Sequence, residues 1–318
     1  MSAQPTDATE WNQNPAPDSQ RSRTAESQGP DPARGLFEMI PAQVAQGFGL
    51  NIAGRPSANL TLISQNSVLF YVDEYSLLRF SNNNFKGLLP LPDQAREKRI
   101  IFLPDLPSSE LEILLQAIYR VPTSTPGTMG GGSMDDFHEL VRGVGRLPTF
   151  GIAFKSVILP HTYIFDRILS FSAQYPLEVY ALGGQYDIDE LAVSASPHTL
   201  TVELTDIEEG LAGRIGALYL LRLIRLHEKR KKIIMDLLVE GPDSATVCRS
   251  EHQEELKKKW NMAIASLLSG INAGTPKELI QEVVMTGTSV IICDRCIEAR
   301  DARLNAILTE WSMSARSI

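Results

Sequence analysis

Two cysteines separated by two residues, Cys293 and Cys296, are the sharpest chemical signal in this sequence. Thiolates at this spacing can hold one zinc ion, and a second pair of zinc-ligand types lies upstream at Cys248 and His252. The four side chains make a Cys₃His set, which uses every cysteine of the chain. The sequence therefore predicts Cys248, His252, Cys293 and Cys296 as ligands of a structural zinc ion that ties the C-terminal helices together.

Two other interpretations of these cysteines stay open. One is that they are ordinary thiols without a ligand, which the distance between the two pairs and the helix-like sequence after Cys296 favour. The other is an enzyme or redox protein that uses Cys293 and Cys296. No βαβ pattern surrounds the motif, so the redox interpretation has less support.

Other catalytic motifs fail on their context. Gly143-Val144-Gly145 imitates the start of a dinucleotide-binding loop, but Pro148 takes the third glycine position and the segment follows a helix. The sequence contains no Gly-x-Ser-x-Gly and no His-Glu-x-x-His motif. The five histidines stand singly, at positions 138, 161, 198, 227 and 252. We therefore expect no enzymatic activity and no cofactor apart from the candidate zinc.

A basic run, Lys229-Arg230-Lys231-Lys232, has two interpretations. It is either a nuclear address or a solvated stripe on a long helix over 218–239. The apolar faces of that helix would hold Leu218, Leu221, Ile224, Ile233 and Leu237. Nucleic-acid binding is not expected, because 38 acidic residues against 30 basic ones give the chain a net charge of −8.

Size and composition frame these sites. A chain of 318 residues with 43% hydrophobic residues has room for about two domains. No basic-then-apolar leader and no run of about 18 apolar residues is visible, so we expect neither secretion nor a membrane span. Three cysteines indicate a reducing compartment, and we expect the chain in the cytoplasm, the nucleus or both.

Residues 1–56 are predicted to form a disordered N-terminal tail, since most of them are polar or proline. An apolar segment within it, 36–52, has three interpretations: it docks on its own domain, docks on a partner, or stays a weakly ordered linker.

The elements of 57–153 predict an α+β domain with the order strand–strand–helix–helix–strand–helix–helix. Two apolar runs flank the polar turn 64–67, and 99–103 is typical of a buried strand. Asn82-Asn83-Asn84 precedes a short apolar helical face. Ser109 and Glu112 have the spacing of a capping box at the start of a helix whose apolar face ends near Tyr119.

The same stretch resembles the BTB/POZ family, whose members mediate protein–protein contacts. The matching segments are Ala58-Asn59-Leu60, Phe70-Tyr71-Val72, Tyr75-Ser76-Leu77-Leu78, Ser81 with Phe85-Lys86-Gly87-Leu88-Leu89, Ile100-Ile101-Phe102-Leu103-Pro104-Asp105, and Leu111, Leu114-Leu115 and Ile118-Tyr119. The resemblance implies a short mixed sheet flanked by helices, homo- or heterodimerisation through this domain, and docking of a cullin by the helix near 108–119 and the next helix. Family members commonly carry Asp in place of Asn59 and His in place of Asp73.

The rest of the chain is predicted to be all-helical, as a region 154–240 similar to the helices that follow BTB domains and a region 241–318 that carries the C-x-x-C pair. "PLEVYALGGQYDIDELA" at 176–192 is similar to a large group of fungal BTB proteins of unassigned role. The resemblance thus extends over 58–318.

These features together predict a protein-interaction module that works as an oligomeriser, an adaptor or a scaffold. The adaptor version is a substrate adaptor of a cullin-type ubiquitin ligase. The alternative is a nuclear regulator of transcription that recruits partners through the same domain.

Overall fold

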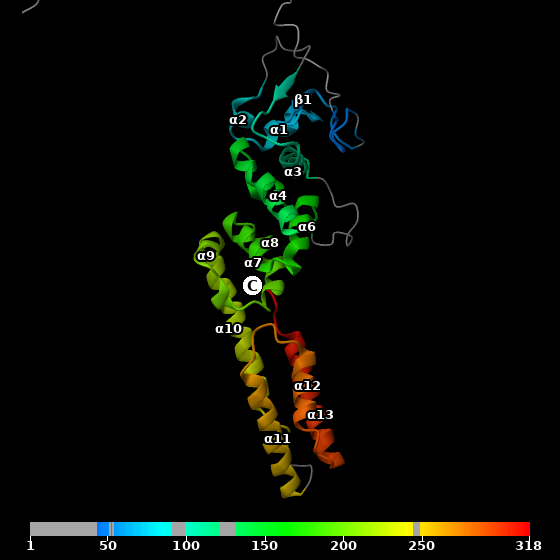
Figure 1. The fold of residues 1–318 in the computed structure, drawn as a ribbon, viewed down its shortest axis with the longest axis vertical. Coiled ribbons are helices and arrows are strands. Elements are labelled where there is room, and N and C mark those ends of the chain that lie inside the picture. Colours follow the sequence, from blue (N-terminus) through cyan, green and yellow to red (C-terminus); the bar gives the residue numbers. More distant parts are fainter. Residues whose placement is uncertain (1–42, 51, 53, 91–98, 121–131, 244–248) are drawn as a thin grey trace, which may run out of the picture. The chain divides into compact units, whose positions relative to one another are not determined.

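The computed structural model describes residues 43–50, 52, 54–90, 99–120, 132–243 and 249–318. Three short strands form one sheet in the order β2-β1-β3: β1 is Leu60–Ile63, β2 is Leu69–Val72 and β3 is Ile100–Phe102. β1, which is labelled in Figure 1, is antiparallel to β2 and parallel to β3. Both neighbours are fixed in register at Leu62, which lies opposite Phe70 and Ile101. With the helices below, these strands confirm a small sheet combined with helices in an α+β chain.

Residues 43–48 lie along the free edge of β2. Leu69 donates a backbone hydrogen bond to the carbonyl of Gln43, and Tyr71 donates one to that of Phe48. The Phe48 ring is almost fully buried beside Phe70 and Tyr119. Part of the apolar segment 36–52 therefore docks on its own domain, and the folded part begins before the predicted boundary at 57. Residues 1–42, 51 and 53 of the predicted disordered tail lie outside the described residues.

Helix α1 (Glu74–Phe80) begins at a cap built from the two residues at which the chain departs from the BTB/POZ pattern. The Asp73 carboxylate accepts the backbone N–H of Ser76, and the Asn59 side-chain oxygen accepts that of Glu74, at 2.8 and 2.9 Å. Asn59 and Asp73 thus satisfy two first-turn donors that would otherwise lack partners.

The predicted short helix after Asn82 is a turn of the opposite hand. In α2 (Asn84–Gly87) all four residues have φ between 53° and 74°. Apolar spacing does not report helix hand, so the sequence placed this turn correctly and its geometry wrongly. Ser81 and Asn83 hold the turn, because each side chain accepts one of its backbone N–H groups and donates a hydrogen bond to the backbone of 149–150.

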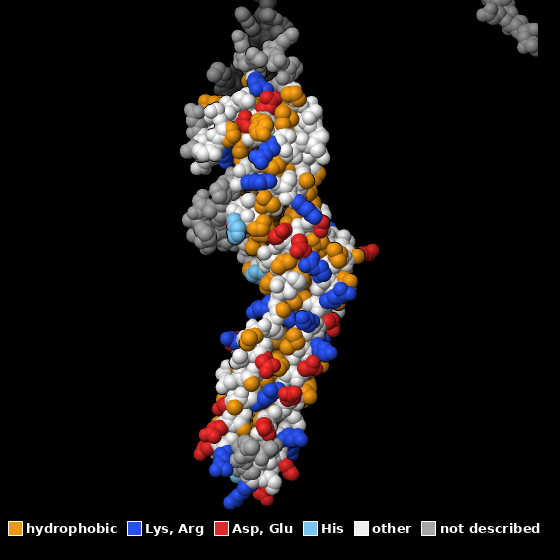
Figure 2. All heavy atoms as spheres, turned by 180° about the vertical axis from the view of Figure 1, so that it is seen from behind, with side chains coloured by type: hydrophobic (Ala, Val, Ile, Leu, Met, Phe, Trp, Pro, Cys, Tyr) orange, Lys and Arg blue, Asp and Glu red, His pale blue; other side chains and the backbone are white. Residues whose placement is uncertain are grey.

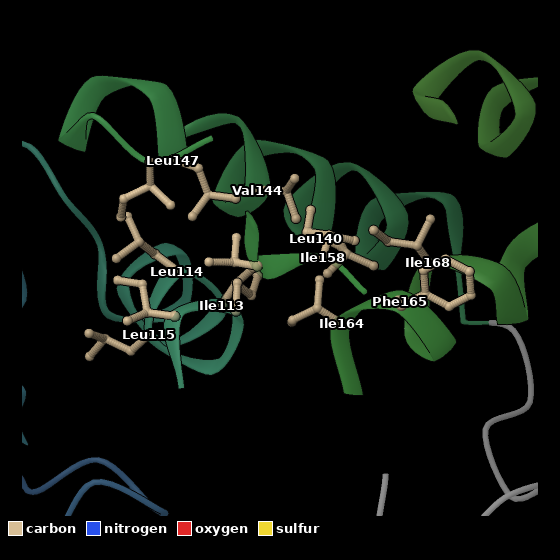
Figure 3. Close-up of a cluster of buried hydrophobic side chains, with 14 of the residues drawn as sticks. Ile113, Leu114, Leu115, Leu140, Val144, Leu147, Ile158, Ile164, Phe165 and Ile168 are labelled. Atoms are coloured by element: carbon tan, nitrogen blue, oxygen red, sulfur yellow. The ribbon is translucent and has the colours of Figure 1, made fainter. Parts of the chain in front are cut away.

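Helix α3 (Ser108–Ile118) is the centre of the α+β domain. Figure 3 shows its side chains Ile113 and Leu114 turned toward Leu140 and Val144 of α4 (Met134–Gly145), with Ile164 of α6 (Tyr163–Ser170) nearby. Helices α3 and α4 can approach closely because Gly143 has no side chain. A Cβ at this position would lie only 2.7 Å from the Ile113 Cβ. Gly143, the first glycine of the failed nucleotide motif, therefore serves helix packing.

The capping box predicted at Ser109 and Glu112 is wrong. Helix α3 begins at Ser108, whose N–H is accepted by the Asn66 side chain from the β1–β2 turn. Because this partner is distant in sequence, local spacing could not reveal it. A capping box exists instead at the start of α4, between Ser133 and Asp136.

The rest of the described chain is helical, as predicted. The remaining helices are η2 (Leu147–Phe150), α5 (Phe154–Val157), η3 (Phe171–Ala173), α7 (Pro176–Gln185), α8 (Asp189–Thr199), η4 (Leu204–Asp206), α9 (Glu209–Ile215), α10 (Ala217–Val239), α11 (Ser250–Leu268), α12 (Lys277–Gly287) and α13 (Asp294–Met313). No described helix is long and apolar enough to cross a membrane.

Helix α10 contributes to three apolar clusters, the smallest of which joins its Leu226 to Leu200 and Ala273. Its first half contributes Tyr219 and Leu223 to a core that continues from the sheet, without a break at the predicted boundary 153/154. Its second half contributes Ile234 and Leu238 to a cluster shared with α11, α12 and α13. The packing therefore changes within α10 rather than at residue 240.

The predicted apolar faces of α10 are wrong in the first half of the helix, whereas Ile233 and Leu237 in the second half are partly buried against a core cluster. Leu218, Leu221 and Ile224 are exposed, whereas Tyr219, Leu223, Leu226, His227, Arg230, Ile234 and Leu238 are buried. The first turns of this helix carry apolar residues on more than one side, so periodicity alone could not select the buried side.

His227 should make the stability of this region depend on pH. Burial lowers the folded-state pKa of His227, with a further lowering by Arg230 and opposing effects of Glu203 and Glu228. The unfolded chain therefore binds the proton first, and stability should fall as pH drops through about 6.5. We expect the melting temperature to fall less between about pH 7.5 and about pH 5.5 in His227→Gln than in the wild type. Equal pH slopes in the two proteins would contradict this assignment.

Candidate functional site

The structure brings three of the four predicted zinc ligands to the same end of two helices. Cys293 caps the N-terminus of α13 and Cys296 lies one turn further on, while His252 lies in the first turn of α11. The Cys296 Sγ lies 3.9 Å from the backbone carbonyl oxygen of His252. Cys248, the fourth predicted ligand, lies outside the described residues.

Packing explains part of this arrangement without a metal. Cys296 is fully buried between Leu256 and Ile291, and Cys293 is half-buried against the same cluster. Among the described residues, no three His, Cys, Asp or Glu side chains converge on one point. Zinc binding therefore stays a prediction. Metal analysis of the purified chain tests it: about one zinc per chain that is lost in Cys293→Ser would establish the site.

The four residues of the basic run 229–232 lie on different sides of helix α10. Lys229, Lys231 and Lys232 are exposed, whereas Arg230 is 4% exposed. The prediction of a solvated stripe is wrong at Arg230. On the face drawn in Figure 2, acidic and basic side chains are interspersed over the C-terminal helices and do not form one continuous basic surface.

The helix that the resemblance assigns to a cullin contact has little surface to offer. In α3, residues Glu110, Leu111, Ile113, Leu114, Leu115, Ala117 and Ile118 are buried, and none of its residues is exposed. Glu110 is held by Arg146, whose Nε lies 2.6 Å from its carboxylate. Among the described residues of these two helices, the exposed polar side chains lie on α4, which offers a partner more surface than α3 does.

The outer face of the sheet is apolar on all three strands. We use the name outer sheet face for Thr61, Ile63, Leu69, Tyr71, Ile100 and Phe102. Their register forms two rows across the sheet, Leu69–Ile63–Phe102 and Tyr71–Thr61–Ile100. Ile100 and Phe102 are 49% and 55% exposed, and the other four are half-buried. The prediction of a buried strand over 99–103 therefore holds for Ile101 and Leu103 but not for Ile100 and Phe102.

The outer sheet face ends at a hollow of about 180 Å³ beside Phe102. Its apolar lining comes from Leu88, Phe102, Leu103, Leu106 and Phe150, and its rim includes Lys86, Asp105 and Arg146. The turn α2 positions this lining, because the buried Phe85 ring packs at a tilt against the Phe150 ring, with 4.4 Å between the ring centroids. The hollow is smaller than the roughly 300–1,000 Å³ of small-molecule sites. It suits one side chain of a protein partner better than a metabolite.

In the described part of the chain, β3 also has a backbone edge with no strand beside it. The sheet order places β3 at one end, and no other described strand pairs with it there. Arg99, directly before β3, is held by an ion pair with Glu74 of α1. An open edge next to exposed apolar side chains is the arrangement that extended peptides use when they add a strand to a sheet.

Sequence reasoning missed this surface, although a signal was present. The run Ile100-Ile101-Phe102 is apolar at every position, which is typical of a strand covered on both faces.

Comparison of the chain with family models, with curated proteins and with solved structures finds no match in any of the three.

Proposed function

We propose that this chain is a protein-interaction module with a BTB/POZ-like domain, which binds a protein partner through the outer sheet face and the hollow beside Phe102. One observation carries the proposal. A strand whose sequence is typical of full burial exposes Ile100 and Phe102 in the described chain, so a covering partner would complete its burial.

Two features support this choice of function. The described elements follow the order predicted from the sequence pattern, from β1 and β2 through α1, the turn α2 and β3 to α3 and α4, and the segments that resemble the BTB/POZ family lie on these elements. The surface also has the composition of an interface, with an apolar centre and charged groups such as Lys86 and Asp105 at its rim. The partner would be an extended protein segment that runs beside β3 and places one apolar side chain in the hollow.

Partner capture with a charged variant tests the proposal. In Phe102→Lys the new ammonium group occupies the centre of the surface, and we expect recovery of the partner from a cell lysate to fall at least about tenfold. The variant should fold, because Phe102 is more than half exposed. The measurement is quantitative mass spectrometry of the proteins that co-purify with each variant.

Ile292→Lys is the matched control. Ile292 is 90% exposed and lies directly before α13, away from the sheet. Replacing this apolar residue by lysine should therefore leave recovery of the partner unchanged. A cullin among the proteins lost only in Phe102→Lys would favour the adaptor role, and loss of a second copy of the chain would favour dimerisation. The proposal fails if both variants recover the same proteins as the wild type.

A further inference from the structure

A cavity of about 470 Å³ opens among the C-terminal helices, far in sequence from the outer sheet face. It lies where α10, the turn 272–276, the start of α12 and the end of α13 meet. Its lining residues are Arg230, Gly274, Thr275, Pro276, Lys277, Glu278, Trp311, Ser312 and Arg316. This volume lies within the roughly 300–1,000 Å³ range of small-molecule sites.

Arg230 forms the inner wall of this cavity. Its side chain is 96% buried, with the guanidinium 4.0 Å above the Trp311 ring. Nε donates to the carbonyl of Ala273, and Nη1 donates to oxygens of Ser314 and Ala315, at 2.8–3.1 Å. These neutral acceptors fix the orientation of the guanidinium but leave its charge unneutralised. Nη2 makes no hydrogen bond in the described part of the chain and is not enclosed by it.

Two more cations line the mouth of the cavity. Lys277 and Arg316 are exposed, and neither they nor Arg230 forms an ion pair with a carboxylate in the described ranges. Glu278 is the one acidic residue among the lining side chains, so the cavity carries net positive charge. The pKa of Arg230 is lowered to about 10, first by burial and then by repulsion from Arg316. An anion would relieve this repulsion.

The start of α12 adds backbone donors at the same place. The helix has 11 residues and begins at Lys277 after Pro276, with no side-chain cap on its first-turn N–H groups. Uncapped N–H groups and the helix dipole favour an anion at this end. A buried arginine with one nitrogen lacking a partner and an uncapped helix N-terminus are independent features that converge on one cavity.

We propose that this cavity binds a phosphate group. Arg230 Nη2 and the first-turn N–H groups of α12 hold the oxygens, while Lys277 and Arg316 neutralise the charge. The cavity leaves room for a small organic moiety bonded to the phosphate. Binding here ties α10, α12 and α13 together, because each contributes to the lining.

Titration calorimetry with inorganic phosphate tests the site, with sodium chloride at matched ionic strength as the reference. We expect one phosphate per chain and a change in tryptophan fluorescence, because Trp311 lines the cavity. Lys277→Ala and Arg316→Ala should each weaken binding about tenfold, since each removes one charged contact. Both positions are exposed, so these variants should fold even if replacement of Arg230 prevents folding.

Lys231→Ala is the matched control, because Lys231 follows Arg230 on the same helix but points to solvent. It should bind phosphate as the wild type does. Phosphoserine in a second titration separates a free phosphate site, which rejects it, from a phosphomonoester site, which binds it more tightly. Absence of binding, equal affinity in all variants, or the same heat from chloride would overturn the proposal.

Discussion

Replacement of Gly184 by alanine should lower the free energy of unfolding by about 3 kcal/mol. A Cβ at this position would lie 2.2 Å from the backbone carbonyl oxygen of Ile215, which is too close for any carbon atom. Ile215 is fully buried at the end of α9, and the clash is with backbone, so no side-chain rotation relieves it. A Cβ at the neighbouring Gly183 would likewise lie 2.8 Å from the backbone nitrogen of Ala192. Both glycines are therefore close-approach positions where α7 packs on α8 and α9.

Thermal unfolding followed by circular dichroism measures this effect. For a folded region of the size of 43–318, a loss of about 3 kcal/mol corresponds to a decrease of roughly 5–10 °C in melting temperature. Gly213→Ala is the matched control on α9, where the new methyl group would meet nothing within 4 Å. The control should be neutral or slightly stabilising, because alanine is the better helix former. Equal melting temperatures for the two variants would show that α7 and α9 do not approach as described.

Replacement of Trp260 by alanine should cost about 4 kcal/mol. The Trp260 side chain is fully buried in the cluster that joins the second half of α10 to α11, α12 and α13. Truncation removes its packing contacts in the cluster that includes Ile234 and Ile280. It also leaves a cavity, which the surrounding helices cannot fill because they hold one another in place. Denaturant unfolding of the full chain, with fluorescence and circular dichroism as separate probes, measures the loss.

Trp260→Phe separates the packing contribution from the polar one. The indole Nε1 is buried and has no hydrogen-bond partner in the described part of the chain. Phenylalanine keeps most of the apolar volume and removes this donor, so the loss should be below about 1.5 kcal/mol. If Trp260→Phe destabilises as much as Trp260→Ala, the nitrogen has a partner and the apolar packing is not the main contribution.

Local patterns were sufficient for most of the element order. The apolar runs around 64–67 predicted the hairpin, and the periodicity of Leu111, Leu114 and Ile118 predicted a buried face of α3. These signals depend on neighbours within one element, and such neighbours are visible in sequence.

Features that depend on distant partners were not predictable. Asn66 caps α3 from 42 positions away, and the left-handed turn at Asn84–Gly87 is held by hydrogen bonds to the backbone of 149–150. On α10, the apolar pattern did not distinguish the exposed Leu218 from the buried Leu223, because that choice depends on which helices lie alongside.

The candidate sites likewise combine features that local sequence predicts with features that depend on distant residues. The C-x-x-C spacing located Cys293 and Cys296 at one helix start, yet zinc binding stays a prediction. Arg230 was hidden in a basic run, where an exposed side chain is the ordinary expectation. Its burial follows from Trp311 and Ala273, which reach it from other parts of the chain. A binding cavity built from three helices has no contiguous sequence motif.

The central claim is that a protein partner covers the outer sheet face, and photo-crosslinking from position 102 tests it most directly. A photoreactive phenylalanine analogue at Phe102 keeps the aromatic ring, and the same analogue at Ile292 controls for an exposed position away from the sheet. The account predicts a discrete adduct with a protein, identified by mass spectrometry, from position 102 and none from position 292. The absence of an adduct at 102, or the same adducts from both positions, would contradict it.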